Sequence, residues 1–435
     1  MSETEPTGHN PEDGALPEGW KLNIISDVAS FVRGVTYKKS EARDSAGPGY
    51  MPLLRATNIS SEVVTFTDYV FVPRSGVKGE QILRQNDLVI ATSSGSSAIV
   101  GKSAAILAEF DGTFGAFCAV LRPSSEVAPR YVHLFAQSPN IRELWSNLAR
   151  GTNINNLKSE QVLSTLIPIA PLAEQERIVE ILEEQLSRLD AALESVRVVR
   201  EKAAQFRRSL LHAAFTGTLT GHNIEDGQLP KGWALSTLGS VAKWGSGGTP
   251  KSGTAAFYNG SIPWAVIGDL TEGEVFDTAQ AITQLGLESS SAKVVEPGTV
   301  LLAMYGASIG RTGIAAVEMA TNQAIAFAKV DEKKMNRYFL LKYLQEQKKA
   351  FVEAGQGGAQ PNISQTVIRP WPIPVPPLAE QERIVEILEE QLSRLDAALA
   401  VADAIEKRSA ALRRSLLHAA FTGRLTEKWR ESVHV

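Results

Sequence analysis

A helical pattern of hydrophobic residues runs through positions 172–211 and recurs at 378–417. In the first copy the apolar positions step by four and three: Ile178, Leu182, Leu186, Leu189, Leu193 and Val196. Pro171 and Pro377 suit helix starts, and acidic residues cluster early in each pattern while basic residues cluster late. A helix of this length would span roughly 60 Å, so it needs a packing partner along its whole length.

The two patterns belong to a tandem repeat. Residues 171–193 and 377–399 are identical, and the identity resumes as RRSLLHAAFTG at 207–217 and 413–423. A shorter echo precedes each copy, LPEGW at 16–20 and LPKGW at 229–233. The whole unit is therefore duplicated. We expect the two helices to pair antiparallel, so that the acidic first half of each faces the basic second half of the other. The alternative is that each helix packs only on its own domain.

The segments between the helices alternate short apolar strands, such as 88–93 and 299–305, with Gly- and Ser-rich turns. One helical pattern precedes a Gly-rich exit at 151–157 and at 357–363. The predicted class is α+β, with two globular α/β domains joined by two long antiparallel coiled-coil helices in a pseudo-two-fold repeat. The predicted divisions are a disordered tail (1–15), recognition domain 1 (16–170), helical spacer 1 (171–220), recognition domain 2 (221–376), helical spacer 2 (377–426) and a C-terminal tail (427–435).

Composition is that of a folded globular chain, with 43% hydrophobic and 21% charged residues. The sequence contains no apolar run of membrane-spanning length and its acidic first twenty residues do not resemble a signal peptide, so we expect a cytoplasmic protein. The net charge of −4 is unusual for a DNA-binding protein. Each copy of the repeated 23-residue segment has six acidic and two basic residues, so any basic surface must be local.

Several motifs suggest chemistry, and each has a simpler explanation. The lone Cys118 lies in an apolar run, and the six histidines have no metal-ligand spacing, so we expect no metal. GASIG at 306–310 matches a nucleophile elbow at Ser308, but strand-like residues follow it where that motif needs a helix. GSSAIVGKS at 95–103 has the wrong glycine spacing for a P-loop. No methyltransferase motif is present in the sequence.

The loops of both domains combine the residue types that contact phosphates and base edges. In the first domain the candidate DNA contacts are Arg33, Tyr37, Lys38, Lys39, Arg55, Asn58, Ser94, Ser96, Lys102, Asn153 and Lys158. In the second domain they are Lys251, Trp264, Asp269, Tyr305, Ser308, Arg311, Gln356 and Gln360. Alternatively, Asn58 and Asp269 cap turns, Trp264 is a core aromatic, and the equivalent Lys102 and Arg311 lie on solvated turns. The aligned Asn156 and Asn362 are expected to cap their turns.

Polar positions of the repeated helix are also unchanged between the copies. Packing alone would fix only the apolar seam, so outward-facing residues that recur are candidates for binding the same partner twice. They are Gln175, Glu176, Arg177 and Glu180, with Gln381, Glu382, Arg383 and Glu386 in the second copy. Recent duplication would give the same identity.

The order of these segments resembles the specificity subunit of type I restriction-modification enzymes. The resemblance rests on the two PLAEQERI helices together with GGTPKSG, IPWAVIGDL, YGASIGRTG and AQPNIS in the second domain. It implies two domains that each read one half of a bipartite double-stranded DNA site, and helices that dock two modification subunits.

Those subunits would methylate adenine N6 with S-adenosylmethionine, and restriction subunits using ATP and Mg²⁺ would join them; this chain itself would need no cofactor. The first domain has RGVTYKK where the second has the GGTP pattern, so its half-site should differ. A coiled-coil scaffold whose end domains bind proteins or carbohydrate, and a hydrolase built on Ser308, remain the competing classes.

Overall fold

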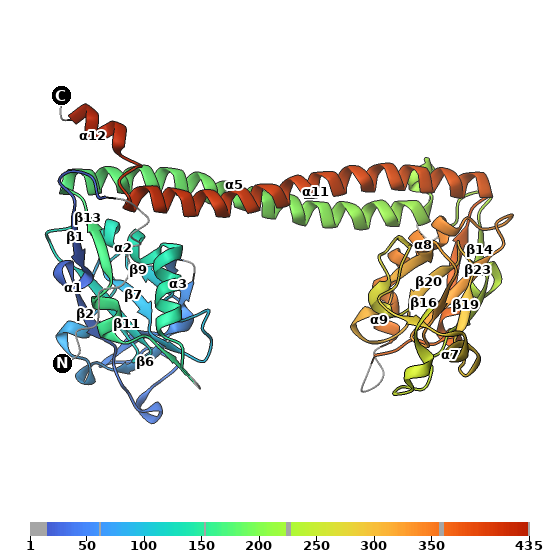
Figure 1. Ribbon diagram of the computed structural model, residues 1–435, viewed down its shortest axis with the longest axis horizontal. Coiled ribbons are helices and arrows are strands. Elements are labelled where there is room, and N and C mark those ends of the chain that lie inside the picture. Colours follow the sequence, from blue (N-terminus) through green and yellow to red (C-terminus); the bar gives the residue numbers. More distant parts are fainter. Residues whose placement is uncertain (1–14, 61, 152–153, 223–227, 356–360, 434–435) are drawn as a thin grey trace. The chain divides into compact units, whose positions relative to one another are not determined.

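The computed structural model describes residues 15–60, 62–151, 154–222, 228–355 and 361–433 (Figure 1). The predicted N-terminal tail lies outside them, apart from Ala15. The chain forms two compact units, residues 1–196 with 404–435, and residues 197–403. Each unit contains one globular domain, the first half of the long helix that follows it, and the second half of the other long helix. No described helix is long and apolar enough to cross a membrane.

The first unit is built on a six-stranded sheet. Its strands lie in the order β2 (Ala29–Arg33), β11 (Cys118–Pro123), β7 (Leu88–Ala91), β9 (Ser103–Ala105), β5 (Glu62–Val64) and β4 (Ile59–Ser60). A three-stranded sheet follows the order β10 (Thr113–Phe114), β3 (Tyr50–Leu54), β6 (Val70–Pro73). Two ribbons pair β1 (Lys21–Ile24) with β13 (Leu166–Ile169), and β8 (Ser93–Ser94) with β12 (Asn155–Asn156).

The central strand β7 is buried on both faces, as its continuous apolar sequence predicts. Leu88 and Ile90 pack in the cluster that contains the helices, while Val89 and Ala91 pack in a second cluster with Phe114. Alternate residues of a strand point to opposite faces, so one short strand joins the two layers of the domain.

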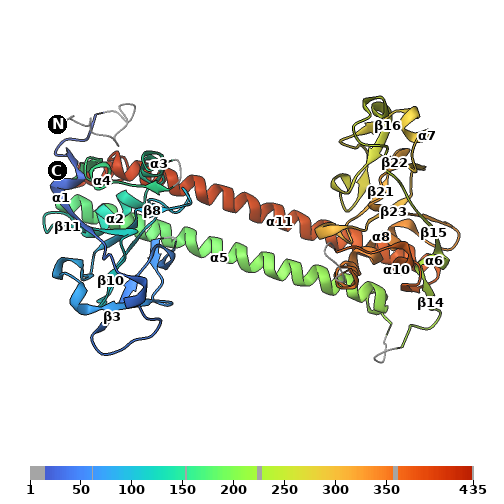
Figure 2. The same ribbon diagram turned by 90° about the horizontal axis from the view of Figure 1, so that it is seen from below.

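Helices cover one face of this sheet (Figure 2). They are α1 (Ile25–Val28), α2 (Pro129–Gln137), α3 (Pro139–Leu148) and α4 (Ser159–Leu163). The C-terminal helix α12 (Glu427–Val433) stands apart from the sheet (Figure 1). The single helix predicted before the Gly-rich exit is in fact two, because Pro139 cannot continue α2 and instead begins α3. Tyr131 and Phe135 of α2 each make edge contacts with the ring of Phe421, 5.2 Å between centroids.

The second unit repeats this plan. Its five-stranded sheet has the order β15 (Ala242–Ser246), β23 (Ile325–Val330), β20 (Val300–Ala303), β21 (Thr312–Ala315) and β17 (Glu274–Val275). A four-stranded sheet has the order β18 (Ala281–Ile282), β16 (Tyr258–Ala265), β22 (Met319–Thr321), β19 (Lys293–Val295), and a ribbon pairs β14 (Ala234–Thr237) with β24 (Pro372–Val375). The helices are α6 (Leu238–Val241), α7 (Gln284–Glu288), α8 (Arg337–Glu346), α9 (Lys348–Ala354) and α10 (Gln365–Ile368).

The two repeated helices are α5 (Leu172–Thr216) and α11 (Leu378–Phe421). In the first unit Asp190 of α5 pairs with Arg413 of α11, Oδ1 to Nη1 at 3.0 Å. In the second unit the repeat-equivalent residues, Asp396 and Arg207, form the same ion pair. The antiparallel pairing of acidic with basic halves is therefore confirmed within each unit. The alternative also contributes, because Ile178 and Leu182 of α5 pack on their own domain as well as near Leu417 of α11.

A glutamate at the start of each long helix closes its unit; Glu174 is buried and Glu380 is half-buried. Glu174 accepts hydrogen bonds from Trp20 Nε1 at 2.9 Å, from the Thr426 hydroxyl at 2.6 Å, and from the guanidinium of Arg430. Its repeat mate Glu380 accepts from Trp233 Nε1 at 3.1 Å, from the Thr220 hydroxyl, and contacts His222 Nε2, both at 2.7 Å. The tryptophans of the LPEGW and LPKGW echoes are thus anchors between the chain before each domain and the helix after it.

Burial alone would raise the pKa of Glu380, but its hydrogen bonds to Thr220, His222 and Trp233 outweigh burial and hold the pKa below its usual value. The carboxylate therefore stays ionised inside the junction.

Candidate nucleic-acid interface

Four chain segments meet at one end of the first domain's sheet: those that follow β2 and β7, the turn before β11, and the residues that precede α4. Gly34 N donates to Cys118 O at 3.2 Å, Thr92 N donates to Phe117 O at 2.9 Å, and Leu157 N donates to Thr92 O at 2.8 Å. These bonds hold together the residues that we call the loop end of domain 1: 33–39, 92–97, 115–117 and 154–158. They contain four basic and no acidic residues, so the local charge is positive although the whole chain carries −4.

Comparable backbone bonds recur in the second domain. Gly248 N donates to Thr321 O at 3.0 Å, as Val35 N donates to Phe114 O at 2.7 Å in the first domain; Met304 N donates to Ala324 O at 2.8 Å, and Ile363 N donates to Met304 O at 2.9 Å. The loop end of domain 2 comprises residues 246–251, 304–308, 322–324 and 361–363, with one basic and no acidic residue. The two domains therefore present equivalent loops that differ in sequence and charge.

Glycines permit the close approach of these loops. A Cβ on Gly34 would lie 2.1 Å from Gly115 O, and one on the equivalent Gly247 would lie 1.8 Å from Thr321 O. Because no other residue fits at either position, the first loop of each domain is fixed against the turn beside it.

Seven of the eleven candidates in domain 1 lie at its loop end: Arg33, Tyr37, Lys38, Lys39, Ser94, Ser96 and Lys158. Arg33 and Lys158 are exposed, and Arg33 Nη2 donates to Ser159 Oγ at 3.0 Å. Lys38 forms an exposed ion pair with Glu41 at 3.7 Å, which contributes little in water.

Tyr37, one of the seven, is half-buried against a small apolar cluster. Lys102 is half-buried beside the loop end, with its carbonyl accepting from Ala91 N at 2.8 Å.

In domain 2 the loop end includes Lys251, Tyr305 and Ser308, and the Tyr305 side chain is 43% exposed. Arg311 accepts from Ala303 N at 2.8 Å, the bond that Lys102 makes in domain 1, so the two basic residues are structurally equivalent. Asn153, Gln356 and Gln360 lie outside the described residues.

Three candidates have structural roles, and these roles are the alternatives that the sequence left open for them. Asn58 is 3% exposed; its Oδ1 accepts from Arg55 N at 2.9 Å and its Nδ2 donates to two carbonyls. Asp269 caps the equivalent turn, accepting from Val266 N at 2.8 Å and from Ala279 N at 3.1 Å. Trp264 is 5% exposed and donates to Gly248 O.

Arg55 is partly exposed, but its guanidinium donates to Asp68 O at 3.1 Å and lies 3.5 Å from that residue's carboxylate. It belongs to the three-stranded sheet rather than to the loop end.

The repeated polar positions of the helices separate into two groups. Glu176, Glu180, Glu382, Arg383 and Glu386 are exposed, Arg177 is half-buried, and each arginine pairs with the glutamate three residues on. We call these six residues the docking faces of α5 and α11.

The prediction that Gln175 and Gln381 face outward was wrong. Gln175 is 1% exposed, accepts from Ala128 N at 3.0 Å and donates to Ala170 O at 2.8 Å. Gln381 is 0% exposed and makes the same kind of bonds to Asn336 N, Lys334 O and Pro376 O. These side chains fasten each helix to its own domain, a role that their invariance between copies could not distinguish from partner binding.

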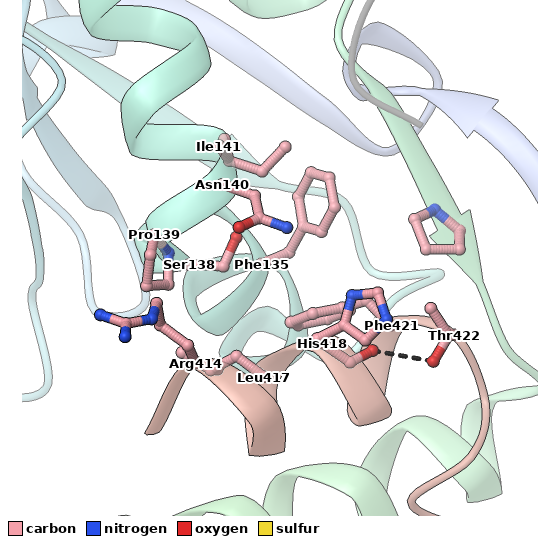
Figure 3. A pocket seen from close by; sticks show the side chains of 11 residues that line it. Phe135, Ser138, Pro139, Asn140, Ile141, Arg414, Leu417, His418, Phe421 and Thr422 are labelled. Carbon is pink, nitrogen blue, oxygen red and sulfur yellow. Dashed lines mark hydrogen bonds between the residues drawn. The ribbon is translucent and has the colours of Figure 1, made fainter. Parts of the chain in front are cut away.

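The cavity in Figure 3 lies between α2, α3 and the last turns of α11, in the first unit. Its volume of about 50 Å³ holds only a few water molecules, and Phe135, Leu417 and Phe421 contribute apolar walls. The Thr422 hydroxyl beside it is satisfied by the His418 carbonyl at 2.9 Å. The cavity is too small for a nucleotide.

The residues around Ser308 do not form a nucleophile elbow. Gly306–Ser308 is a single 3₁₀ turn, and the strand β21 follows it where the motif requires a helix. The hydrolase alternative therefore loses its structural basis.

Two side chains at the loop ends were absent from the sequence-based candidates. Phe117 is 69% exposed at the turn before β11, and Gln323 is exposed at the equivalent turn before β23, where the Thr249 hydroxyl donates to its Oε1. Alignment of the FGAFCAVL and TNQAIAF segments could have identified both, because each segment opens the same strand of its repeat.

Comparison with known families follows this architecture. Residues 17–195 and 230–400 match the family model of the type I restriction modification DNA specificity domain. The chain therefore belongs to this family, whose members are the non-catalytic DNA-recognition components of type I restriction-modification systems. The resemblance noted in the sequence is confirmed, as is the predicted fold class.

Among its relatives is the StySPI specificity subunit of Salmonella potsdam, 32% identical, with the alignment covering 96% of this chain and 91% of that protein. The EcoKI specificity subunit of Escherichia coli K12 is 30% identical over the same shares of both chains. A solved chain from a study of complex assembly and conformational transition of the type I R-M system matches 95% of this chain and all of that one. Its TM-score is 0.70 at 23% identity, which supports the fold.

Proposed function

We propose that each loop end reads one half of a bipartite sequence in double-stranded DNA. The observation that carries this proposal is the concentration of exposed polar and basic side chains on equivalent, rigidly held loops of two domains that belong to a DNA-specificity family. Arginine, lysine, serine and asparagine are the residue types that contact phosphates and base edges.

The two half-sites differ in this proposal because the two loop ends differ. Domain 1 carries Arg33, Lys38 and Lys39 in its first loop, whereas domain 2 has Ser246 and a single lysine, Lys251, in the equivalent segment. At the end of the central strand, domain 1 has small serines where domain 2 has the exposed Tyr305.

The docking faces of α5 and α11 are proposed to bind two copies of a modification subunit, one at each repeat. The two faces carry the same three charged residues, and five of the six side chains are exposed, Arg177 being half-buried. One partner surface can therefore fit both faces. In that assembly, S-adenosylmethionine, ATP and Mg²⁺ serve the modification and restriction subunits, and we place the complex in the cytoplasm.

Salt-dependent DNA binding tests the proposal. In the complex with modification subunits, replacing Arg33, Lys38 and Lys39 with alanine should weaken binding. It should also reduce the slope of log K against log salt by about 0.9 for each lost phosphate contact. Lys21→Ala, on the β1–β13 ribbon, is the matched control and should leave the slope unchanged. Binding that is absent, or insensitive to salt, in the unmodified complex would refute DNA recognition and leave the scaffold alternative.

A further inference from the structure

Phe117 occupies the middle of the loop end of domain 1. On the side of β2, the carbonyl of the next residue, Cys118, accepts a hydrogen bond from Gly34 N. On the side of β7, the carbonyl of Phe117 accepts from Thr92 N and Ser93 N. Cys118 N closes the turn by donating to Gly115 O at 2.8 Å. The backbone of Phe117 is therefore fixed from both sides while its ring is 69% exposed.

The surroundings of this ring are polar and basic. Arg33 and Ser94 lie on the two segments that flank the turn, and both are predicted DNA contacts. Another exposed large apolar side chain of the loop end is Ile154, 59% exposed, on the segment that enters β12. A single exposed apolar residue is common on protein surfaces and needs no explanation. An exposed aromatic ring on a backbone fixed by hydrogen bonds, among side chains that can hydrogen-bond to DNA, does need one.

The equivalent turn of domain 2 has a different character. Met304 N donates to Ala324 O as Thr92 N donates to Phe117 O, so Ala324 takes the place of Phe117. Ala324 is 6% exposed, and the turn presents the polar Gln323 instead. The turn that keeps its backbone bonds thus changes from apolar to polar between two domains expected to read different sequences.

The edges of the bases offer one apolar group, the 5-methyl of thymine in the major groove. An apolar side chain at a surface that reads base edges therefore has a specific target. We propose that Phe117 packs against the 5-methyl group of a thymine in the half-site read by domain 1, and so determines specificity at that base pair. This inference rests on the proposed function.

The test uses the complex of this chain with modification subunits. The duplexes carry the DNA sequence that this complex methylates. Each thymine of both half-sites is replaced, one at a time, with deoxyuridine, which lacks only the methyl group, and binding is measured by fluorescence anisotropy. We expect one replacement, in one half-site, to weaken binding by the complex without substitutions roughly fourfold. That factor corresponds to the free energy of burying one methyl-sized group.

Phe117→Ala should weaken binding to the thymine duplex at least as much and should remove the difference between thymine and deoxyuridine at that position. Leu107→Ala is the matched control: Leu107 is 61% exposed in the same domain, but it follows β9 beside the start of β7, whereas Phe117 lies beside the end of β7. The control should discriminate as the unmodified complex does.

Unchanged discrimination in Phe117→Ala would overturn the inference. So would a loss of affinity that does not depend on the methyl group at any position, which would indicate a wedge between base pairs instead. If the complex without substitutions fails to bind the sequence that it methylates, the proposed function itself is overturned, and the inference with it.

Discussion

Removing the carboxylate of Glu174 should destabilise the first unit far more than removing its repeat mate destabilises the second. The Glu174 side chain is 2% exposed and the Arg430 guanidinium beside it belongs to a side chain that is 16% exposed. Glu174→Ala leaves that cation without its charge partner and leaves the indole N–H of Trp20 without an acceptor. Breaking a buried ion pair from one side costs about 3–5 kcal/mol.

Glu380 is a weaker case of the same arrangement. Its side chain is 19% exposed, and the residue in the place of Arg430 is His222, 31% exposed. Loss of hydrogen bonds to a partly solvated carboxylate costs about 1–3 kcal/mol, so Glu380→Ala should destabilise the second unit by the smaller amount.

Native-state hydrogen exchange can measure the two units separately, with amides of β7 reporting on the first and amides of β20 on the second. Glu174→Ala should lower protection of β7 only, and Glu380→Ala that of β20 only. The control is Glu176→Ala, at an exposed residue two positions from Glu174. It should change the protection free energy of the β7 amides and of the β20 amides by less than about 0.5 kcal/mol. Equal losses for both glutamates, or a loss in β7 of less than about 1 kcal/mol, would refute the reasoning.

Two further predictions concern the buried His133 of α2 and the docking faces. Burial lowers the pKa of His133 to about 4 from 6.5, so the folded form binds fewer protons than the unfolded form. Stability of the first unit should be complete above pH 6.5 and fall by about 3 kcal/mol as pH drops to 4. His133→Leu, which copies Leu340 of the second repeat, should flatten this part of the urea-unfolding profile, and an unaltered profile would contradict the assignment. Glu176→Lys or Glu382→Lys alone should leave one modification subunit bound in native mass spectrometry, and both together none; two bound subunits in the double variant would exclude these faces as docking sites.

The long-range organisation could be predicted from the sequence because it depends on the periodicity of apolar residues and on the internal repeat. The heptad-like apolar steps predicted α5 and α11, and the separation of acidic from basic halves predicted charge pairing between the helices, of which Asp190–Arg413 and Asp396–Arg207 are instances. The continuous apolar runs also located the central strands β7 and β20.

The fine assignment of side chains could not be obtained in the same way. Gln175 and Glu176 are adjacent, polar and identical in both repeats, yet the first is buried against a backbone and the second is exposed. Asn58 has the chemistry of a base contact, but its amide is used within a turn. Phe117 has the chemistry of a core residue, and only the fold places it at the surface. Residue type limits what a side chain can do, while burial and hydrogen bonding decide what it does.

The central claim, that two domains read two half-sites, is tested most directly by sequencing the methylated adenines in cells that express the complex. The account predicts a bipartite motif with a methylated adenine in each half, and predicts that substitutions at the loop end of domain 1 alter one half while the other half stays unchanged. A single continuous motif, or a change in both halves caused by domain 1 alone, would contradict it.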